Sequence, residues 1–465
     1  MMDENQRLML DEALAGYGFR ESDAELIRHN ENMTFRIGSH YLLRIHKHHE
    51  GFTTGMIYEG LDRAQLYDSE IAFITHLKAC GLNVQTPVPN LNGEWVTRLS
   101  DGTLATVLTW LEGHTVDKSE LLPPLCYKIG VMTAKLHEAS RSFASVPALR
   151  YDGLLCERLK NKLEQLVCTG TISREYSEVM TAALGKIIVF LGQTEDRCIL
   201  VHSDLSCSNM LITEAGLAPI DFSLFGYCHP MMDISALFCC IGGSVNRKAI
   251  ADGYRAAGGT FDSRAVDYTF ALNVLLGIML HCESWTKEDW FVEKLSGWCK
   301  NIFLPLTQDN AVVDPAIRVV CATDKDIPVW LALVHAVADD FPGLGLDEYA
   351  KILEKNIARQ TALCVREDGK LAGILLFSPN RHCLSCMAVH PEYRHNKIAS
   401  ALISEMLRRM PEGDIQVTTF RDGDAKGTAP RALYRKFGFE PEELLTEFDY
   451  PVQRFVLHRK RKSLN

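Results

Sequence analysis

The chain has 465 residues, of which 47% are hydrophobic and 23% are charged. This composition is typical of a globular protein, and the length excludes one ordinary domain and favours about three folding units. The net charge of −10 argues against a nucleic-acid-binding protein, because no strong basic field is available for phosphates.

The N-terminus and the cysteines indicate a cytoplasmic protein. Residues 1–10 are acidic and polar and lack the apolar core of a signal peptide. The longest notable apolar run, 271–280, contains Asn273 and is far too short to span a bilayer. The 15 cysteines are scattered through apolar segments and cannot all pair, which indicates reduced thiols. We therefore expect no membrane association and a cytoplasmic location.

The first predicted elements in chain order are a short helix with a turn over residues 1–24 and then a β-hairpin. In the second hairpin strand, 41–45, side chains alternate between two faces, so Arg44 shares a face with Leu42. Taken alone, Arg44 is also explained as an ordinary surface cation on a strand.

A helix is predicted over 61–80, because apolar residues recur there at helical spacing. Glu70 lies next to this apolar stripe, and by itself it is equally explained as an exposed helix residue. A buried strand at 104–110 leads into a loop that contains Glu112. The remaining helices of this half are predicted at 129–137, 150–195, 234–241 and 261–298.

Residues 201–223 place three chemically useful side chains between apolar runs. Asp204 and Asn209 are five positions apart, and Asp221 follows a second apolar run. Phosphoryl transfer needs a carboxylate beside the attacking hydroxyl, and an amide and a second carboxylate that hold magnesium on the phosphates. The alternative is two buried strands joined by a polar turn. A turn does not require these residues in this order, so the first interpretation is favoured.

This stretch resembles the catalytic loop and D-F-G motif of protein kinases. It looks more like the aminoglycoside phosphotransferase/choline kinase family, which usually has H-G-D-x-x-x-x-N and then I-D-F/W. Ser203 stands where Gly is usual in that family. Residues 226–234 resemble its G-x-x-x-P-x-x-D-[LI], in which the Asp, here Asp233, braces the catalytic loop.

The resemblance implies a bilobal protein-kinase-like domain and a role for each motif residue. Asp204 would orient or deprotonate the acceptor hydroxyl, and Asn209 and Asp221 would hold Mg²⁺. ATP contacts are implied for the strand cation, its helix partner and the hinge between the lobes: Arg44, Glu70, Trp110 and Glu112. The implied domain covers 1–306, with an N-lobe at about 25–110 and a C-lobe at about 114–306.

A polar stretch at 307–316 predicts a linker. After it, apolar segments typical of strands and helices begin again and continue over 317–465. A first strand, a turn and a helix are followed by three strands, at 361–365, 371–378 and 383–389. A polar, cationic loop then runs into a helix with an apolar row. This arrangement, in which a strand and a turn lead into a helix with cationic residues at its start, is typical of an anion-binding site. The first N–H groups of the helix are free to bind phosphate.

The loop after the third strand resembles the acetyl-CoA pyrophosphate loop of GCN5-related N-acetyltransferases (GNAT), usually V-x-P-x-x-[RQ]-x-x-G-x-[GA]. Val389, Pro391, Arg394 and Ala399 match this pattern, and Lys397 replaces the central Gly. The resemblance implies a GNAT α/β fold with a mixed, mostly antiparallel sheet. Acetyl-CoA contacts are implied for the end of the strand and the loop: Met387, Val389, Arg394, His395, Asn396, Lys397, Ile398 and Ala399.

A second motif, residues 430–439, resembles the A-x-x-L-Y-x-x-x-G-F of the same family. Tyr434 would then lie near the acetyl-CoA sulfur and protonate the leaving thiolate. The alternative for Tyr434 is a core aromatic residue.

Together the two halves predict an α+β protein with ATP, Mg²⁺ and acetyl-CoA as cofactors. The expected function is a bifunctional transferase that acts on small molecules with hydroxyl and amine groups, and aminoglycosides are one possibility by analogy of fold. Two alternatives remain open: the kinase-like half is a non-catalytic nucleotide- or substrate-binding regulatory module, or the acetyltransferase half is degenerate.

Overall fold

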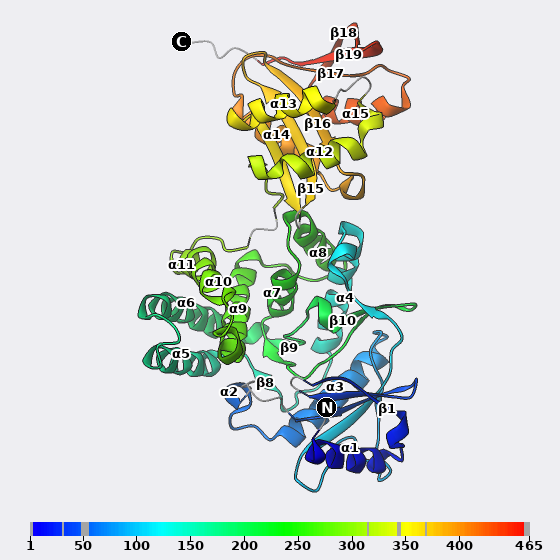
Figure 1. The fold of residues 1–465 in the computed structure, drawn as a ribbon, viewed down its shortest axis with the longest axis vertical. Coiled ribbons are helices and arrows are strands. Elements are labelled where there is room, and N and C mark those ends of the chain that lie inside the picture. The colour runs from blue at the N-terminus through cyan, green and yellow to red at the C-terminus, as the bar shows by residue number, and fades with distance from the viewer. Residues whose placement is uncertain are drawn as a thin grey trace. The chain divides into compact units, whose positions relative to one another are not determined.

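The computed structural model describes residues 3–29, 32–47, 55–313, 316–341, 346–367 and 370–459. The chain forms two compact units, and we describe each by itself (Figure 1). The first unit is Met1–Ile241 with Ile250–Asp314, and the second is Gly242–Ala249 with Pro315–Asn465. Two residues of the expected linker 307–316, Asp314 and Pro315, lie outside the described residues.

The first unit begins with an antiparallel sheet in the order β1-β2-β3-β6-β4, and β5 also pairs with β6. Its strands are β1 (Ala24–His29), β2 (Met33–Ile37), β3 (Tyr41–Ile45), β4 (Pro87–Val88), β5 (Thr97–Arg98) and β6 (Leu104–Thr109). In β3, Arg44 pairs with Thr34 of β2 on one side and Thr106 of β6 on the other. This central position in the sheet fixes the backbone of Arg44 and holds its side chain in the interior.

Helices α1 (Glu4–Tyr17), α2 (Gly55–Tyr58) and α3 (Arg63–Ala79) complete this lobe. Asp3 and Gln6 form a capping box at the start of α1, and Gly18 ends the helix in a left-handed conformation. Leu10 and Leu14 of α1 pack against Phe35 and other residues of the sheet. Helix α3 carries Glu70 on its buried face, which brings this carboxylate to Arg44.

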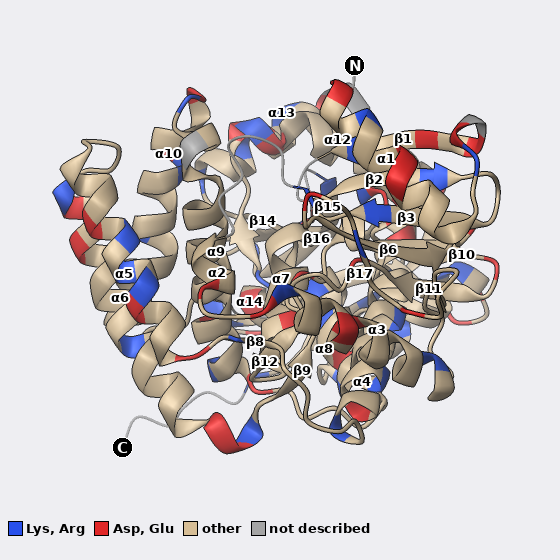
Figure 2. Ribbon diagram, turned by 90° about the horizontal axis from the view of Figure 1, so that it is seen from below, with Lys and Arg blue, Asp and Glu red and all other residues tan. Residues whose placement is uncertain are grey.

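The second lobe of the first unit is mostly helical. Its helices are α4 (Pro123–Arg141), α5 (Gly153–Cys168), α6 (Arg174–Gln193), α7 (Met231–Cys240), α8 (Ser244–Ala256), α9 (Ser263–Trp285), α10 (Trp290–Trp298) and α11 (Leu304–Thr307). The boundary between the two units falls within α8, at Ala249. Lys and Arg alternate with Asp and Glu along α5 and α6 (Figure 2), so these helices present no basic field.

Within the part of the chain that the structure describes, one helix, α9, is long and apolar enough to cross a membrane by length and composition. Its apolar segment is Ser263–Cys282, and 67% of the most apolar stretch is buried inside the protein. It therefore has the features of a core helix, in agreement with the expectation from the sequence that this segment does not span a bilayer.

Short strands position residues 201–223, which carry the three candidate phosphotransfer residues. They are β7 (His114–Thr115), β8 (Leu149–Arg150), β9 (Ile199–Val201), β10 (Met210–Thr213), β11 (Gly216–Pro219) and β12 (Gly226–Cys228). Because β10 and β11 form a hairpin in which Met210 faces Pro219, the segments before β10 and after β11 emerge side by side. The Ile220 N–H donates to the Asn209 carbonyl at 2.9 Å, which brings Asn209 and Asp221 to the same end of the hairpin.

The second unit is built on a seven-stranded sheet in the order β13-β14-β15-β16-β17-β19-β18. Its strands are β13 (Val320–Cys321), β14 (Ala362–Glu367), β15 (Lys370–Ser378), β16 (Cys383–Val389), β17 (Ile415–Phe420), β18 (Glu440–Glu447) and β19 (Tyr450–Leu457). The pair β16 and β17 is parallel and the other pairs are antiparallel. The mixed, mostly antiparallel sheet expected for this half is confirmed.

Among the described residues of this unit, four α-helices follow the start of the sheet: α12 (Ile327–Ala336), α13 (Leu346–Ala358), α14 (Ile398–Arg409) and α15 (Thr428–Lys436). Trp330 of α12 and Leu353 of α13 lie with Ile374 of β15 in one buried cluster. Within the described residues, β16 pairs with β17 at one register position, Cys383 opposite Gln416. Among the described residues no ladder pair joins the two strands beyond Cys383, so the rest of this edge of β16 is not paired with β17.

Candidate active sites

A buried carboxylate, Asp233 of α7, fixes the loop that follows β9. It accepts hydrogen bonds from the backbone N–H groups of His202 at 3.0 Å and Ser203 at 2.7 Å. It also bonds to Nε2 of His137 at 2.9 Å. All three partners lie in the interior, so Asp233 has the bracing position expected from the sequence, and His137 supports it from α4.

Asp204 and Asn209 contact each other at the end of this loop. Asn209 Nδ2 donates to Asp204 Oδ2 at 2.7 Å and to the Asp204 carbonyl at 2.9 Å. With the amide nitrogen engaged, Asn209 Oδ1 is the atom left to bind a cation. Burial raises the pKa of Asp204 to about 6. A carboxyl group that titrates near neutral pH is suited to accept a proton from a hydroxyl.

Asp221 lies against two arginines. Arg44 Nη2 forms a 2.7 Å ion pair with Glu70 Oε1, and its Nη1 is 3.5 Å from Asp221 Oδ1. Burial opposes the ionisation of Asp221, but the charges of Arg44 and Arg28 hold its pKa below the ordinary value. The structure therefore brings together five residues that the sequence predicted for this site: Arg44, Glu70, Asp204, Asn209 and Asp221.

Arg44 retains unused hydrogen-bonding capacity although it is buried. Its Nε and Nη1 have no hydrogen-bond partner among the described residues. Leaving buried N–H donors unpaired is costly, on the order of 1–3 kcal/mol each. An anionic ligand beside Asp221, such as the phosphates of a nucleotide, would satisfy them. Asn209 and Asp221 supply the oxygen donors that Mg²⁺ prefers, so this site fits both ATP and magnesium.

Arg28 is a site residue that the sequence did not reveal. Its Nη2 lies 2.6 Å from Asp221 Oδ2, and its side chain is 45% exposed. It stands on β1, an edge strand whose residues are mostly exposed. The strand lacks the alternation of apolar and polar residues that would have placed Arg28 near the site.

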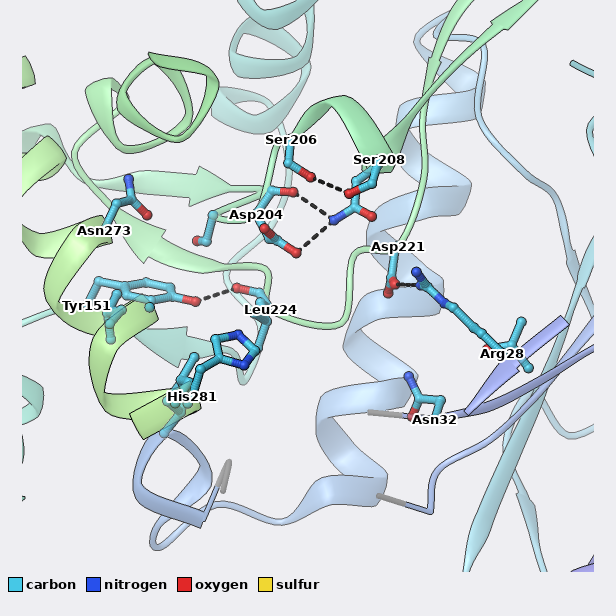
Figure 3. Close-up of a pocket in the computed structure, with 17 residues that line it drawn as sticks. Arg28, Asn32, Tyr151, Asp204, Ser206, Ser208, Asp221, Leu224, Asn273 and His281 are labelled. Carbon is cyan, nitrogen blue, oxygen red and sulfur yellow. Dashed lines mark hydrogen bonds and ion pairs between the residues drawn. The ribbon is translucent and has the colours of Figure 1, made fainter. Parts of the chain in front are cut away.

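Arg28, Asp204, Asn209 and Asp221 line a cavity of about 370 Å³ (Figure 3), and the Arg44–Glu70 pair lies behind Asp221. Arg28 and Asp221 lie on one side of Asp204 in this view, and Tyr151, Asn273 and His281 lie on the other. The cavity thus has a side with the metal- and phosphate-binding candidates and a separate wall. Leu276, Gly277 and Leu280 line the cavity and belong to this wall, because they lie one and two turns after Asn273 on the same face of α9. Ile57 and Leu224 also line the cavity.

The expected hinge residues lie elsewhere. Trp110 and Glu112 connect β6 to β7, and neither lines this cavity. Arg36 joins them, because its guanidinium lies 4.5 Å from the Trp110 ring centroid and donates to Glu112 Oε1 at 2.8 Å. Their contact with an adenine ring stays a prediction.

In the second unit, the loop between β16 and α14 folds tightly through two left-handed residues, His395 (φ 67°) and Lys397 (φ 63°). Lys397 is the N-cap of α14 and makes no side-chain capping bond, so the first N–H groups of the helix stay available to an anion. Arg394 pairs with Asp340 at 3.0 Å. Asn396 turns inward, and its Nδ2 donates to the carbonyls of Tyr393 and Arg394.

A cavity of about 1110 Å³ lies beside this loop and the end of β16. It is lined by every acetyl-CoA residue predicted from the sequence except Asn396. The charged groups on its wall are mostly cationic: Arg381, Arg394, Lys397, Lys426 and Arg454, against Asp340 and Glu447. A wide, cationic cavity at an uncapped helix start fits the phosphates of coenzyme A.

Tyr434 of α15 also lines this cavity. It is 5% exposed, and its ring packs beside Phe439 and Phe455. Burial raises the pKa of Tyr434 above its ordinary value, so the phenol stays protonated at neutral pH. Its position combines the two interpretations from the sequence, because the ring belongs to a core cluster and the residue also lines the cavity.

Comparison with known proteins gives the class of each unit. Residues 23–268, more than half of the chain, match the phosphotransferase enzyme family, and the chain belongs to this family. Residues 330–439 match the acetyltransferase (GNAT) family. The protein is therefore a two-part transferase, and both family resemblances seen in the sequence are confirmed.

The individual relatives that follow are kinases. The chain is 27% identical over 243 residues to amicoumacin kinase of Bacillus subtilis (strain 168), a match that covers 50% of this chain and 67% of that protein. A solved amicoumacin kinase, hAmiN in complex with AMP-PNP, Ca²⁺ and Ami, is 19% identical with a TM-score of 0.52, covering 67% of this chain and 95% of that one. A microcompartment-associated aminopropanol kinase is also 19% identical with a TM-score of 0.52, and the coverages are 65% and 98%. These likenesses confirm the kinase-like fold.

Proposed function

We propose that the protein is a bifunctional small-molecule-modifying transferase. The first unit transfers the γ-phosphoryl group of ATP to a hydroxyl, and the second transfers acetyl from acetyl-CoA to an amine. The substrates are aminoglycoside-like compounds or other metabolites with amino and hydroxyl groups. The observation that carries the proposal is the convergence of Asp204, Asn209 and Asp221 on one cavity, with the Arg44–Glu70 pair beside them.

In the first unit, Asp204 would orient the acceptor hydroxyl and accept its proton. Asn209 holds this carboxylate through Nδ2 and would bind the metal through Oδ1, together with Asp221. Magnesium, when bound, neutralises charge on the phosphates. Glu70 keeps the Arg44 guanidinium in place. The Arg44 N–H groups without hydrogen-bond partners could then bind the phosphates without a change of side-chain conformation. The names of the relatives, amicoumacin kinase and aminopropanol kinase, support a small-molecule acceptor.

In the second unit, the start of α14 and the wall cations would hold the acetyl-CoA phosphates. The edge of β16 beyond Cys383, which has no ladder pair with β17 among the described residues, offers backbone groups to the rest of the cofactor. The amine would lose a proton to solvent and attack the thioester carbonyl directly. Tyr434 would give its phenolic proton to the departing thiolate and regain a proton from solvent. The raised pKa of Tyr434 supports a role as proton donor at neutral pH.

One observation favours a second candidate function. Asp221, the expected metal ligand, already makes ion pairs with Arg28 and Arg44. Cations at these positions could replace a metal, so that the first unit binds a nucleotide or a substrate without turnover and regulates the acetyltransferase. This module would require neither magnesium nor the proton-accepting carboxylate of Asp204.

A mass-shift screen of amino sugars, amino alcohols and other hydroxylated amines with the full chain separates these functions. ATP with Mg²⁺ and acetyl-CoA are supplied separately, and we expect a phosphate shift in one arm and an acetyl shift in the other. Asp204→Asn should lower phosphorylation at least about 100-fold and leave acetylation unchanged. Tyr434→Phe should lower acetylation about 10- to 100-fold.

Asp117→Asn serves as the matched control, because Asp117 is an exposed residue that caps a turn outside both cavities. Nucleotide binding without any phosphorylated product would favour the regulatory module. Phosphorylation that survives Asp204→Asn would contradict the catalytic assignment.

A further inference from the structure

We propose that the hydroxyl substrate of the first unit carries at most one positive charge and combines an apolar portion with an N–H or O–H donor. This inference rests on the proposed phosphotransferase function and narrows its substrates. A polycationic aminoglycoside is excluded from the class.

The wall on the acceptor side of the cavity is largely apolar. It comes mainly from α9, whose Leu276 and Leu280 are buried and line the cavity, and from Ile57 of α2. Gly277 lies between these leucines in the sequence and adds no side chain. An apolar portion of a ligand gains about 25 cal/mol for each Å² that it buries against such side chains, whereas an ammonium group there loses hydration without compensation.

The described residues that line the cavity contain two carboxylates, Asp204 and Asp221. Asp221 already forms ion pairs with Arg28 and Arg44. Asp204 is the proposed proton acceptor for the reacting hydroxyl, so it is not available to an ammonium group. No further carboxylate among the described lining residues faces the acceptor wall. A molecule with several ammonium groups needs several anionic partners once it leaves water, and this wall does not supply them.

Asn273 is the polar feature that selects the ligand. Its Nδ2 donates to the Met232 carbonyl at 3.1 Å and to Ser235 Oγ at 2.6 Å. These two bonds fix the amide, so Oδ1 is the atom left for the cavity, and Figure 3 shows it on the side of Asp204. An amide oxygen accepts hydrogen bonds only, so the ligand must present an N–H or O–H group here.

Two aromatic residues complete the wall without adding charge. The Tyr151 hydroxyl donates to the Leu224 carbonyl at 2.7 Å, which holds the phenol in one orientation. His281 stacks on Trp285 with 4.8 Å between ring centroids, and burial lowers its pKa. A neutral imidazole and a fixed phenol accommodate an uncharged or singly charged ligand.

A charge-specific variant tests this inference. A Cβ atom added at Gly277 would meet the Trp285 ring at 3.6 Å, an ordinary contact, so a side chain fits there. Gly277→Asp adds a carboxylate to the wall, and Gly277→Asn adds the same shape without charge. Both replace a helix glycine and should not weaken α9.

Binding is measured by isothermal titration on the full chain with Mg²⁺ and AMP-PNP present. The probes are phenylalaninol, with one ammonium group, and kanamycin, with several. For the unmodified chain we expect phenylalaninol to bind at least tenfold more tightly than kanamycin. Gly277→Asp should improve kanamycin binding at least about tenfold, the effect of one close charge pair, and Gly277→Asn should not.

Three results would overturn the inference: kanamycin binding as tightly as phenylalaninol, no gain from Gly277→Asp, or no binding of either probe while the nucleotide binds. Failure of the proposed function gives a different pattern. In that case the chain does not bind AMP-PNP or does not turn over ATP. The relative affinities of phenylalaninol and kanamycin can still be measured without nucleotide, so the two failures are distinguishable.

Discussion

Burial of Asp204 sets the pH range in which the first unit can work. The pKa of this carboxyl is raised to about 6, mainly by burial, so the protonated form predominates below that pH and cannot accept a proton from the acceptor. We expect kcat/KM for phosphorylation to fall by about tenfold for each pH unit on the acid side. Because the negative charge of Asp221 contributes to the raised pKa, bound Mg²⁺ should move this fall in kcat/KM to lower pH.

The pH profile is measured from pH 8 to 5 at saturating Mg²⁺. Asp204→Asn is the control, since its residual activity should lack the acid fall. A profile that stays flat from pH 8 to 5 would remove Asp204 from the role of proton acceptor.

Arg28 and magnesium compete for the same carboxylate. The Arg28–Asp221 pair is 2.6 Å long and partly exposed, so breaking it costs about 1 kcal/mol or less. We expect Arg28→Gln to tighten Mg²⁺ binding by up to about fivefold, measured by titration of Mg²⁺ into the chain with AMP-PNP present. Arg141→Gln is the matched control, because Arg141 forms an exposed pair with Glu138 at 3.2 Å and does not line the cavity. Weaker Mg²⁺ binding in Arg28→Gln would show instead that Arg28 helps to hold the nucleotide.

Local sequence predicted the motif residues of this site but not their neighbours. Asp204, Asn209 and Asp221 are within 18 positions of one another, and a loop and a hairpin bring them together. Arg28 is 193 positions from its partner, and no periodicity marks it. Asn273 and Gly277 lay within a helix predicted from its apolar content, which gave no sign that one of its faces lines a cavity.

At the scale of elements, two positions keep a glycine-like backbone without glycine. Ser203 (φ 68°) and Lys397 (φ 63°) are both left-handed, and both stand where the resembled families usually have Gly. A side chain in this conformation costs about 1–2 kcal/mol. The sequence departs from the family patterns at these positions, yet the loops keep a backbone conformation that glycine adopts readily.

We therefore expect Lys397→Gly to be more stable than Lys397→Ala by up to about 1 kcal/mol, after the larger backbone entropy of unfolded glycine is subtracted. Both variants lose the same charge and differ in one Cβ atom. The comparison uses the thermal midpoint of the full chain without ligand. If Lys397→Ala is equally stable or more stable, the left-handed backbone at this position is not strained.

Other elements show what limits prediction. The apolar row of Ile398, Leu402, Met406 and Met410 predicted a helix, and α14 confirms it. The strand β18 was not predicted, because its sequence EPEELLTE lacks β-branched and aromatic residues except one Thr and is almost fully exposed. It forms through pairing with β19 at the edge of the sheet, and the residues of β18 alone do not predict this pairing.

At the scale of the whole molecule, the chain joins two transferase units that have separate cores. The cluster around Phe73, Leu136 and Phe222 belongs to the first unit, and the cluster around Trp330, Leu353 and Ile374 belongs to the second. The apolar segments that begin again after the polar stretch at 307–316 allowed this division to be expected from the sequence. Gly242–Ala249 also belongs to the second unit, and no local signal in that segment indicates this.

Separate cores predict that each ligand stabilises its own unit. A ligand that binds only the folded state at 100 times its Kd adds about 2.7 kcal/mol, which corresponds to a shift of about 5 °C or more for a unit of this size. In calorimetric scans of the full chain we expect two transitions, one raised by Mg²⁺ with AMP-PNP and the other by coenzyme A. Dephospho-coenzyme A is the control, because it keeps the pyrophosphate that the α14 loop would hold and should retain most of the shift. A single transition that either ligand raises equally would mean that the two units unfold together, and the two binding events would then be coupled through folding.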